Sequence, residues 1–107
     1  MFPKLIDVKG LDNYRLALKY EDGTQGIADV SNLAHKGVFK EWDRNNLFKK
    51  VYLDKESNAV AWNQDLDICP DSLYLKLLGI SFQDWKQKEQ YATNYSFFRN
   101  NYFYVFR

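Results

Sequence analysis

The segment from residue 62 to residue 74 reads WNQDLDICPDSLY, and it decides how the middle of this chain is built. Pro70 suits the first position of a helix, because the backbone N–H that proline lacks would have no helical partner there. The run PDSLYLKLLG then predicts a helix that starts at Pro70 and stops at Gly79. Asp71 falls in its first turn, where negative charge is favoured by about 0.3–1 kcal/mol. The segment therefore predicts a structural joint that leads the chain from a strand into a capped helix.

Three aspartates, Asp65, Asp67 and Asp71, lie beside the only cysteine and admit two other interpretations. A calcium loop would use Asp65 and Asp67 as its first ligands, but no glutamate follows at the right distance. Paired carboxylates can also perform acid–base catalysis, which needs a pocket and partners that the sequence does not show. We therefore expect no metal, no catalytic residue and no cofactor. Cys69 lacks a C-x-x-C partner, and we expect a small, half-buried residue.

The N-terminal third predicts antiparallel strands. Residues 4–9 form a short strand candidate, and residues 13–20, NYRLALKY, alternate between apolar and polar side chains. Asp22-Gly23 predicts a tight primed turn, because glycine tolerates the positive φ that such a turn demands. The run QGIADV returns as a strand, in which Gly26 predicts a bulge.

The middle of the chain predicts one or two helical turns and then a second hairpin. Ser31 is a good N-cap for residues 31–42, whose apolar stripe is short and irregular. Residues 47–54 and 59–62 are the two strands of the hairpin. Trp62 is expected in the core with Leu73 and Tyr74 against it. The order of elements predicts an α+β fold: a small antiparallel sheet of two β-hairpins with short helices on one side.

Residues 71–90 resemble a helix-turn-helix, because a GIS tripeptide separates two predicted helices. The second helix starts with the capping pair Ser81 and Asp84, and its Phe82 and Trp85 can face inward. Lys86 and Lys88 would then face DNA. No basic cluster accompanies them, so DNA binding is the weaker hypothesis.

The C-terminal segment is unusually aromatic, since residues 79–107 hold 10 of the 19 aromatic side chains. An exposed apolar strand would be an aggregation hazard. We therefore expect this segment to pair with a sheet edge of its own chain or with a second copy. The expected interface residues are Phe97, Phe98, Tyr102, Phe103, Tyr104 and Phe106.

Composition indicates one domain of 107 residues with a net charge of +1. Such a chain buries about 65% of its unfolded surface and needs no disulfide or metal to fold. A single cysteine favours a reducing compartment, and the first ten residues lack the apolar run typical of a signal peptide. No apolar run approaches the roughly 18 residues that a membrane span needs. We expect a cytoplasmic protein that does not enter membranes. His35, the only histidine, is expected to be a plain surface residue.

Four features follow one another in a characteristic order: the turn at Asp22 and Gly23, Asp29 within IADVSNL, GVF followed by LFKKVYLD, and a W-x-x-D-x-D-x-x-P-D-x-L-Y pattern. The last is the most specific and comprises Trp62, Asp65, Asp67, Pro70, Asp71, Leu73 and Tyr74. In these features the chain resembles the bacterial domain-of-unknown-function 2442 family over about residues 2–78. The extension at residues 79–107 departs from the family pattern.

The resemblance implies a small intracellular α+β module without established enzymatic activity, in which the motif residues are structural. It also implies that some members partner small toxin-like proteins and that others carry an appended helix-turn-helix.

Three functions remain open from the sequence. The first is a non-catalytic, antitoxin-like module that binds another protein or a second copy of itself through strand edges and the aromatic segment. The second is a DNA-binding regulator that uses residues 71–90. The third is a hydrolase or metal-dependent enzyme built on Asp65, Asp67 and Asp71.

Overall fold

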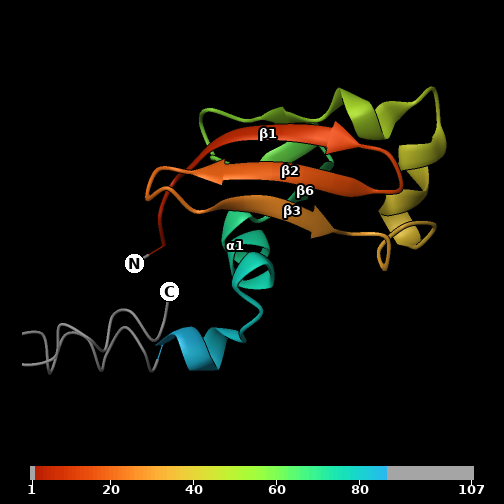
Figure 1. Cartoon of the computed structure of the whole chain (residues 1–107). Coiled ribbons are helices and arrows are strands. Elements are labelled where there is room, and N and C mark those ends of the chain that lie inside the picture. The colour runs from red at the N-terminus through yellow and green to blue at the C-terminus, as the bar shows by residue number, and fades with distance from the viewer. Residues whose placement is uncertain (1, 87–107) are drawn as a thin grey trace, which may run out of the picture.

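The computed structural model describes residues 2–86 of the chain. Two three-stranded antiparallel sheets form the domain (Figure 1). The first sheet contains β1 (Leu5–Leu11), β2 (Arg15–Tyr20) and β3 (Gln25–Asp29). The second contains β4 (Tyr52–Leu53), β5 (Val60–Asn63) and β6 (Leu66–Ile68). Two 3-10 helices, η1 (Gly37–Asp43) and η2 (Leu47–Lys50), connect the sheets, and the helix α1 (Pro70–Leu78) follows them. The predicted α+β fold class is confirmed.

The alternation predicted for the central strand of the first sheet is confirmed. Leu16, Leu18 and Tyr20 of β2 are buried, whereas Lys19 is exposed. Successive side chains of a strand point to opposite faces of the sheet. One face of β2 therefore fills the core, and the other faces solvent.

The β2–β3 turn differs from the predicted primed turn. Gly23 donates its N–H to the carbonyl of Tyr20 at 3.0 Å, and Tyr20 donates to the carbonyl of Thr24 at 2.8 Å. Gly23 has a φ of 91°, whereas Asp22 has a negative φ. The loop is therefore a type I turn followed by a glycine in the left-handed region. Asp22 stabilises this turn through its side chain, whose Oδ1 accepts the N–H of Thr24 at 2.9 Å.

Gly26 marks a close approach and not the predicted bulge. It pairs with Leu18 in an unbroken register along β2 and β3. A Cβ added to Gly26 would lie 3.2 Å from Cδ2 of Leu77 in α1. Bulges and close approaches leave the same signal in a sequence, an isolated glycine inside a strand. The missing side chain here allows α1 to pack against β3.

The connection between the sheets is less regular than predicted. Residues 31–36 form turns, and helical structure begins only at Gly37, so Ser31 does not cap a helix. Residues 47–50, predicted as the start of a strand, form η2. Packing overrides the predicted strand here, because Phe48 of η2 is buried against the rings of Trp42 and Trp62. The second hairpin itself, between β4 and β5, is confirmed.

The joint at residues 62–74 contains one more strand than predicted. The chain turns at residues 64–65 and runs back as β6, which pairs with β5. Cys69 then leads into α1, which begins at Pro70 as predicted. Gly79, with a φ of 71°, ends the helix by donating its N–H to the carbonyl of Leu75 at 2.9 Å. The predicted helix ends are thus confirmed, and a hairpin replaces the simple strand exit.

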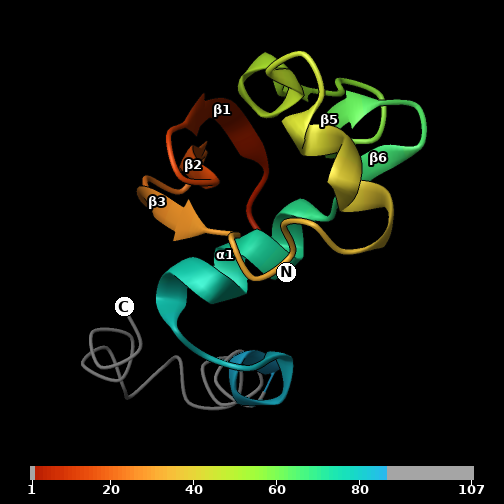
Figure 2. The ribbon, with the colours of Figure 1, turned by 90° about the vertical axis from the view of Figure 1, so that its right-hand side faces the viewer.

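The two sheets face each other across a shared core, with α1 closing one side (Figure 2). Trp62 lies in this core as predicted, and its Nε1 donates to the carbonyl of Phe48 at 2.9 Å. β1 approaches the same carbonyl so closely that a Cβ on Gly10 would lie 2.8 Å from the oxygen. The rings that pack on Trp62 belong to Trp42 and Phe48, whereas Tyr74 packs on the ring of Tyr20.

Asn58 provides a second tie between the sheets. Its Oδ1 accepts the N–H of Leu5 at 3.2 Å, and its Nδ2 donates to the carbonyl of the same residue at 2.9 Å. One amide side chain thereby satisfies both backbone groups of a residue in β1 from the turn between β4 and β5.

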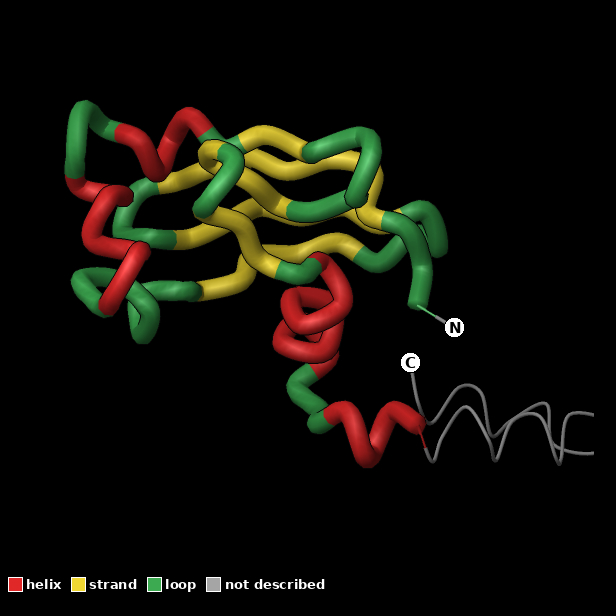
Figure 3. The backbone as a smooth tube through the Cα atoms, turned by 180° about the vertical axis from the view of Figure 1, so that it is seen from behind, coloured by secondary structure: helices red, strands yellow, loops and turns green. Residues whose placement is uncertain are grey.

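A second helical segment begins after α1, at residue 82 (Figure 3). Ser81 caps it as predicted, since its Oγ accepts the N–H of Asp84 at 3.1 Å. Trp85 stacks on Phe2 with 3.9 Å between ring centroids, but Phe82 remains 49% exposed. Of the two aromatic residues that could face inward, Trp85 packs against the core and Phe82 does not. No helix within residues 2–86 is long and apolar enough to span a membrane.

Gly10→Ala should lower the free energy of unfolding by about 1–3 kcal/mol, because the added methyl group would overlap a fixed backbone carbonyl. Gly26→Ala is the matched control, since its methyl group would meet only the movable end of Leu77. Urea unfolding followed by tryptophan fluorescence measures both losses. An equal loss in the two variants would contradict the close approach of β1 to η2.

Tyr20 should make the domain sensitive to alkaline pH. Its side chain is fully buried and donates to the carbonyl of Pro70 at 2.7 Å. Burial raises the pKa of the Tyr20 phenol above its ordinary value of 10.0. The stabilisation is complete below the pKa of the unfolded state, about 10, and is lost as pH rises toward the folded-state pKa.

Urea midpoints at pH 8 and pH 10.5 measure this effect in the wild type and in Tyr20→Phe. The variant should be about 1 kcal/mol less stable at pH 8, because it lacks one hydrogen bond. It should also lose less stability than the wild type on going to pH 10.5. Parallel losses would show that the Tyr20 phenol is not responsible.

Candidate binding pocket

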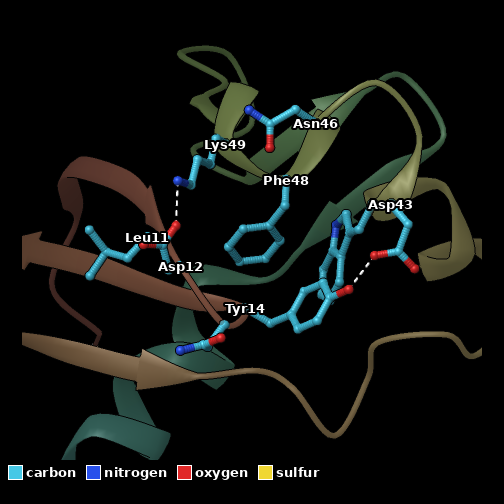
Figure 4. A pocket seen from close by; sticks show the side chains of 9 residues that line it. Leu11, Asp12, Tyr14, Asp43, Asn46, Phe48 and Lys49 are labelled. Carbon is cyan, nitrogen blue, oxygen red and sulfur yellow. Dashed lines mark hydrogen bonds and ion pairs between the residues drawn. The ribbon is translucent and has the colours of Figure 1, made fainter.

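An open pocket of about 430 Å³ lies where the β1–β2 turn meets η1 and η2 (Figure 4). This is the end of the first sheet opposite the β2–β3 turn (Figure 1). Aromatic rings share the pocket walls with charged and amide side chains, and the lining residues are Leu11, Asp12, Asn13, Tyr14, Trp42, Asp43, Asn46, Phe48 and Lys49.

Three aromatic rings form one continuous wall. Tyr14 stacks on Trp42 with 5.9 Å between centroids and 25° between ring planes. Phe48 meets both rings edge-on, at 5.5 Å from Tyr14 and 4.9 Å from Trp42. Offset-stacked and edge-to-face pairs are the favourable arrangements of aromatic rings. The wall is therefore held by its own ring contacts.

The backbone around the pocket adopts an unusual conformation. The structure gives positive φ angles to Asn13 and Tyr14 in the β1–β2 turn, to Asn45 and Asn46 before η2, and to His35. Asparagine tolerates this region, but a bulky residue such as Tyr14 adopts it at a cost. The carbonyl of Tyr14 is held by the N–H of Val30 at 2.9 Å. Such strain concentrates at binding sites, where the surrounding structure enforces it.

Carboxylates and their donors surround the aromatic wall. Asp43 accepts a hydrogen bond from the Tyr14 hydroxyl, and its Oδ2 lies 2.8 Å from Nδ1 of His35. Asp12 forms an ion pair with Lys49 across the pocket. The hydrogen bond to Asp43 raises the pKa of Tyr14, and the hydrogen bond from Lys49 lowers the pKa of Asp12. His35 is exposed as predicted, yet it is engaged with this network.

The indole N–H of Trp42 is a buried donor that lacks a hydrogen-bond acceptor among the described residues. Trp42 is 1% exposed, and its Nε1 has no hydrogen-bond acceptor among residues 2–86. A buried donor without an acceptor costs about 1–3 kcal/mol. A ligand oxygen that accepted this N–H would remove the free-energy cost.

A second hollow of about 410 Å³ lies on the other part of η1. It is lined by Val38, Lys40 and Glu41 of η1 and by the β5–β6 hairpin, which contributes Asp65. Val38 is 59% exposed. Helix η1 therefore has a hollow at each end, and the exposed apolar side chain of Val38 lines the second one.

The residues predicted from the sequence lie mostly elsewhere. Asp22 and Tyr74, 52 positions apart, meet in a hydrogen bond of 2.9 Å from the Tyr74 hydroxyl to Oδ2 of Asp22. Gly23 shapes the adjoining turn. Asp29 accepts the N–H of Ser31 at 2.8 Å, and hydrogen bonds from Ser31 lower its pKa.

The three aspartates of the joint do not share one site. Asp65 lies in the exposed β5–β6 turn, Asp67 lies exposed on β6, and Asp71 is half-buried on α1. Burial raises the pKa of Asp71. Within residues 2–86 the structure contains no group of three or more His, Cys, Asp or Glu side chains able to hold a metal ion. Cys69 is exposed and not half-buried, because it precedes α1 outside the core.

The remaining motif residues Trp62, Pro70 and Leu73 belong to the core or to the start of α1. The predicted interface residues Phe97, Phe98, Tyr102, Phe103, Tyr104 and Phe106 lie outside the described residues, and so does Lys88.

Reasoning from the sequence missed the pocket. The runs DNY at residues 12–14 and RNN at residues 44–46 contained a signal, since asparagine is enriched in the left-handed region. That signal marks two tight turns. It does not reveal that the turns meet in space with Trp42 and Phe48 between them.

A search of curated proteins finds no relative of this chain. One similar solved structure is a crystal structure from Nitrosomonas europaea, described as a "Putative DNA Binding Protein". It superimposes with a TM-score of 0.67 over 84% of this chain, at 23% sequence identity. The chain spans 63% of the length of that protein, and the likeness establishes a shared fold.

The family described as "Protein of unknown function (DUF2442)" matches residues 5–78, which is more than half of the chain. That range runs from the start of β1 to the end of α1 and contains both sheets. This chain belongs to the domain-of-unknown-function 2442 family.

Proposed function

We propose that this protein is a non-catalytic regulatory module that acts by binding another protein, in the manner of an antitoxin. The observation that carries the proposal is the face around η1, which has a hollow at each end and the exposed Val38 in one of them. Protein interfaces combine anchors that enter pockets with exposed apolar contacts around them. Each hollow has room for a large side chain of a partner.

The distribution of reactive side chains supports binding over catalysis. Asp65, Asp67 and Asp71 lie on three different elements, and Asp65 alone lines one of the two hollows. Acid–base catalysis needs groups within hydrogen-bond reach of one reacting centre. The aromatic pocket instead presents ring faces, amides and carboxylates that already hold donors of their own chain.

A DNA-binding regulator is the second candidate, and two observations favour it. The solved structure of similar fold is described as a candidate DNA-binding protein. In this chain, α1 and the helical segment from residue 82 are separated by three residues, 79–81, as in a helix-turn-helix. Residues 2–86, however, carry 12 Lys and Arg against 13 Asp and Glu. That balance supplies no general attraction to phosphates.

The full-length tagged protein, expressed in its native host, should co-purify with a specific protein or with an untagged second copy of itself. Val38→Glu should abolish that association, because it places a charge in the apolar part of the second hollow. Ile27→Glu is the matched control, since Ile27 is 56% exposed but lies on β3 of the first sheet. Circular dichroism checks that both variants fold. Equal capture by the two variants would contradict the proposed face.

Gel-shift assays with duplex DNA separate the two candidates. We expect no retardation that depends on Lys86 and Lys88. Retardation that weakens steeply with salt and is lost in the Lys86→Ala, Lys88→Ala double variant would favour the DNA-binding alternative.

A further inference from the structure

We infer that the aromatic pocket between the β1–β2 turn, η1 and η2 receives a cationic side chain, an arginine of the partner protein. The inference rests on the proposed function and names the chemistry by which this pocket recognises its partner. It depends on the charge of the pocket, on its aromatic wall and on the unsatisfied indole of Trp42.

The charged groups of the pocket favour a cation. Two carboxylates, Asp12 and Asp43, line it against one ammonium group, that of Lys49. Asp12 holds Lys49, and Asp43 holds the Tyr14 hydroxyl and His35. These donors are replaceable, because the side chains of Lys49 and His35 are 45% and 68% exposed. Exposed ion pairs contribute little to stability, so a guest can take their place at low cost.

The aromatic wall favours the same kind of guest. A cation close to a ring face is attracted by the negative charge density of the π system. Tyr14 is the half-buried ring that a guest can reach in the same pocket as the two carboxylates, and the buried rings of Trp42 and Phe48 pack behind it. A planar guanidinium can stack on a ring and donate two parallel hydrogen bonds to a carboxylate, which an ammonium group cannot do. Arginine is therefore preferred over lysine.

Trp42 provides an independent indication that a ligand belongs here. Its side chain is 1% exposed, lines the pocket and keeps a buried N–H without an acceptor among residues 2–86. A guanidinium has no acceptor atom. A peptide, however, brings a carbonyl group with every residue. An arginine within a peptide therefore supplies a donor group for the carboxylates, and its carbonyl oxygen can pair with the Trp42 N–H once the side chains that cover this group move aside.

Other guests fit the pocket less well. An acidic side chain would face Asp12 and Asp43, and repulsion between like charges excludes it. A purely apolar side chain would cover the polar rim without replacing its hydrogen bonds, which costs free energy. A cation with an adjacent carbonyl meets both demands of the pocket.

Titration of the full-length protein with N-acetyl-arginine amide, followed by ¹H–¹⁵N correlation spectra, tests the inference. The indole N–H signal of Trp42 should shift in a saturable manner, while that of Trp62, bonded to Phe48, should move less. N-acetyl-citrulline amide is the matched probe, because it keeps the shape and the carbonyls but lacks the charge. It should bind at least tenfold more weakly, since hydrogen bonds to charged groups are the stronger ones. Tryptophan-to-phenylalanine variants assign the signals.

Asp43→Asn should weaken the binding of the arginine amide about tenfold, because it removes the charge and keeps an acceptor for Tyr14. Asp67→Asn makes the same change of net charge on the exposed face of β6 and should leave binding unchanged. Equal binding of the citrulline probe, or equal binding by the two variants, would overturn the inference. So would the absence of any saturable shift of the Trp42 signal.

These outcomes are distinguishable from failure of the proposed function. Capture of a partner that depends on Val38, without binding of the arginine amide, refutes only the chemistry assigned to the pocket. Binding of the arginine amide without any captured protein refutes protein-based regulation and leaves a site for cations.

Discussion

The backbone carbonyl of Phe48 is the contact on which both the core and the pocket depend. It accepts the indole N–H of Trp62 at 2.9 Å, and β1 passes so close to it that only glycine fits at position 10. A buried carbonyl requires a hydrogen-bond partner, and Trp62 supplies it from the second sheet. The peptide group of Phe48 is therefore held from both sides. The Phe48 ring packs against Trp42 and Trp62 and forms part of the pocket wall.

Several features of the pocket lower the stability of the folded chain. Tyr14 and His35 have left-handed backbone conformations, and Trp42 keeps a buried N–H without an acceptor among residues 2–86. Natural sequences violate local rules at functional sites and compensate for the cost elsewhere. Here the compensation comes from the aromatic contacts and from the core behind them. These destabilising features cluster beside η1, which supports the proposal that this end of the molecule binds a partner.

The family motif serves the opposite end of the first sheet. The Tyr74 hydroxyl reaches Asp22 at the β2–β3 turn, and the Tyr20 hydroxyl reaches the carbonyl of Pro70. These bonds fasten α1 to the sheet, so that Leu77 can occupy the space beside Gly26. Substitutions at the motif should therefore act on folding, whereas substitutions around η1 should act on binding. This separation allows the two roles to be examined independently.

Local signals in the sequence determined the elements whose formation is local. The alternation of β2, the start of α1 at Pro70 and its stop at Gly79 all follow from side-chain direction and backbone freedom. Tertiary structure decided the rest. Residues 47–50 became a 3-10 helix because Phe48 packs between two tryptophans, and β6 formed because β5 offers it a hydrogen-bonding edge. The pocket joins residues 11–14 to residues 42–49, and periodicity within either segment cannot indicate that they meet. Contacts between segments far apart in the sequence depend on how the sheets pack, and only the folded chain specifies that.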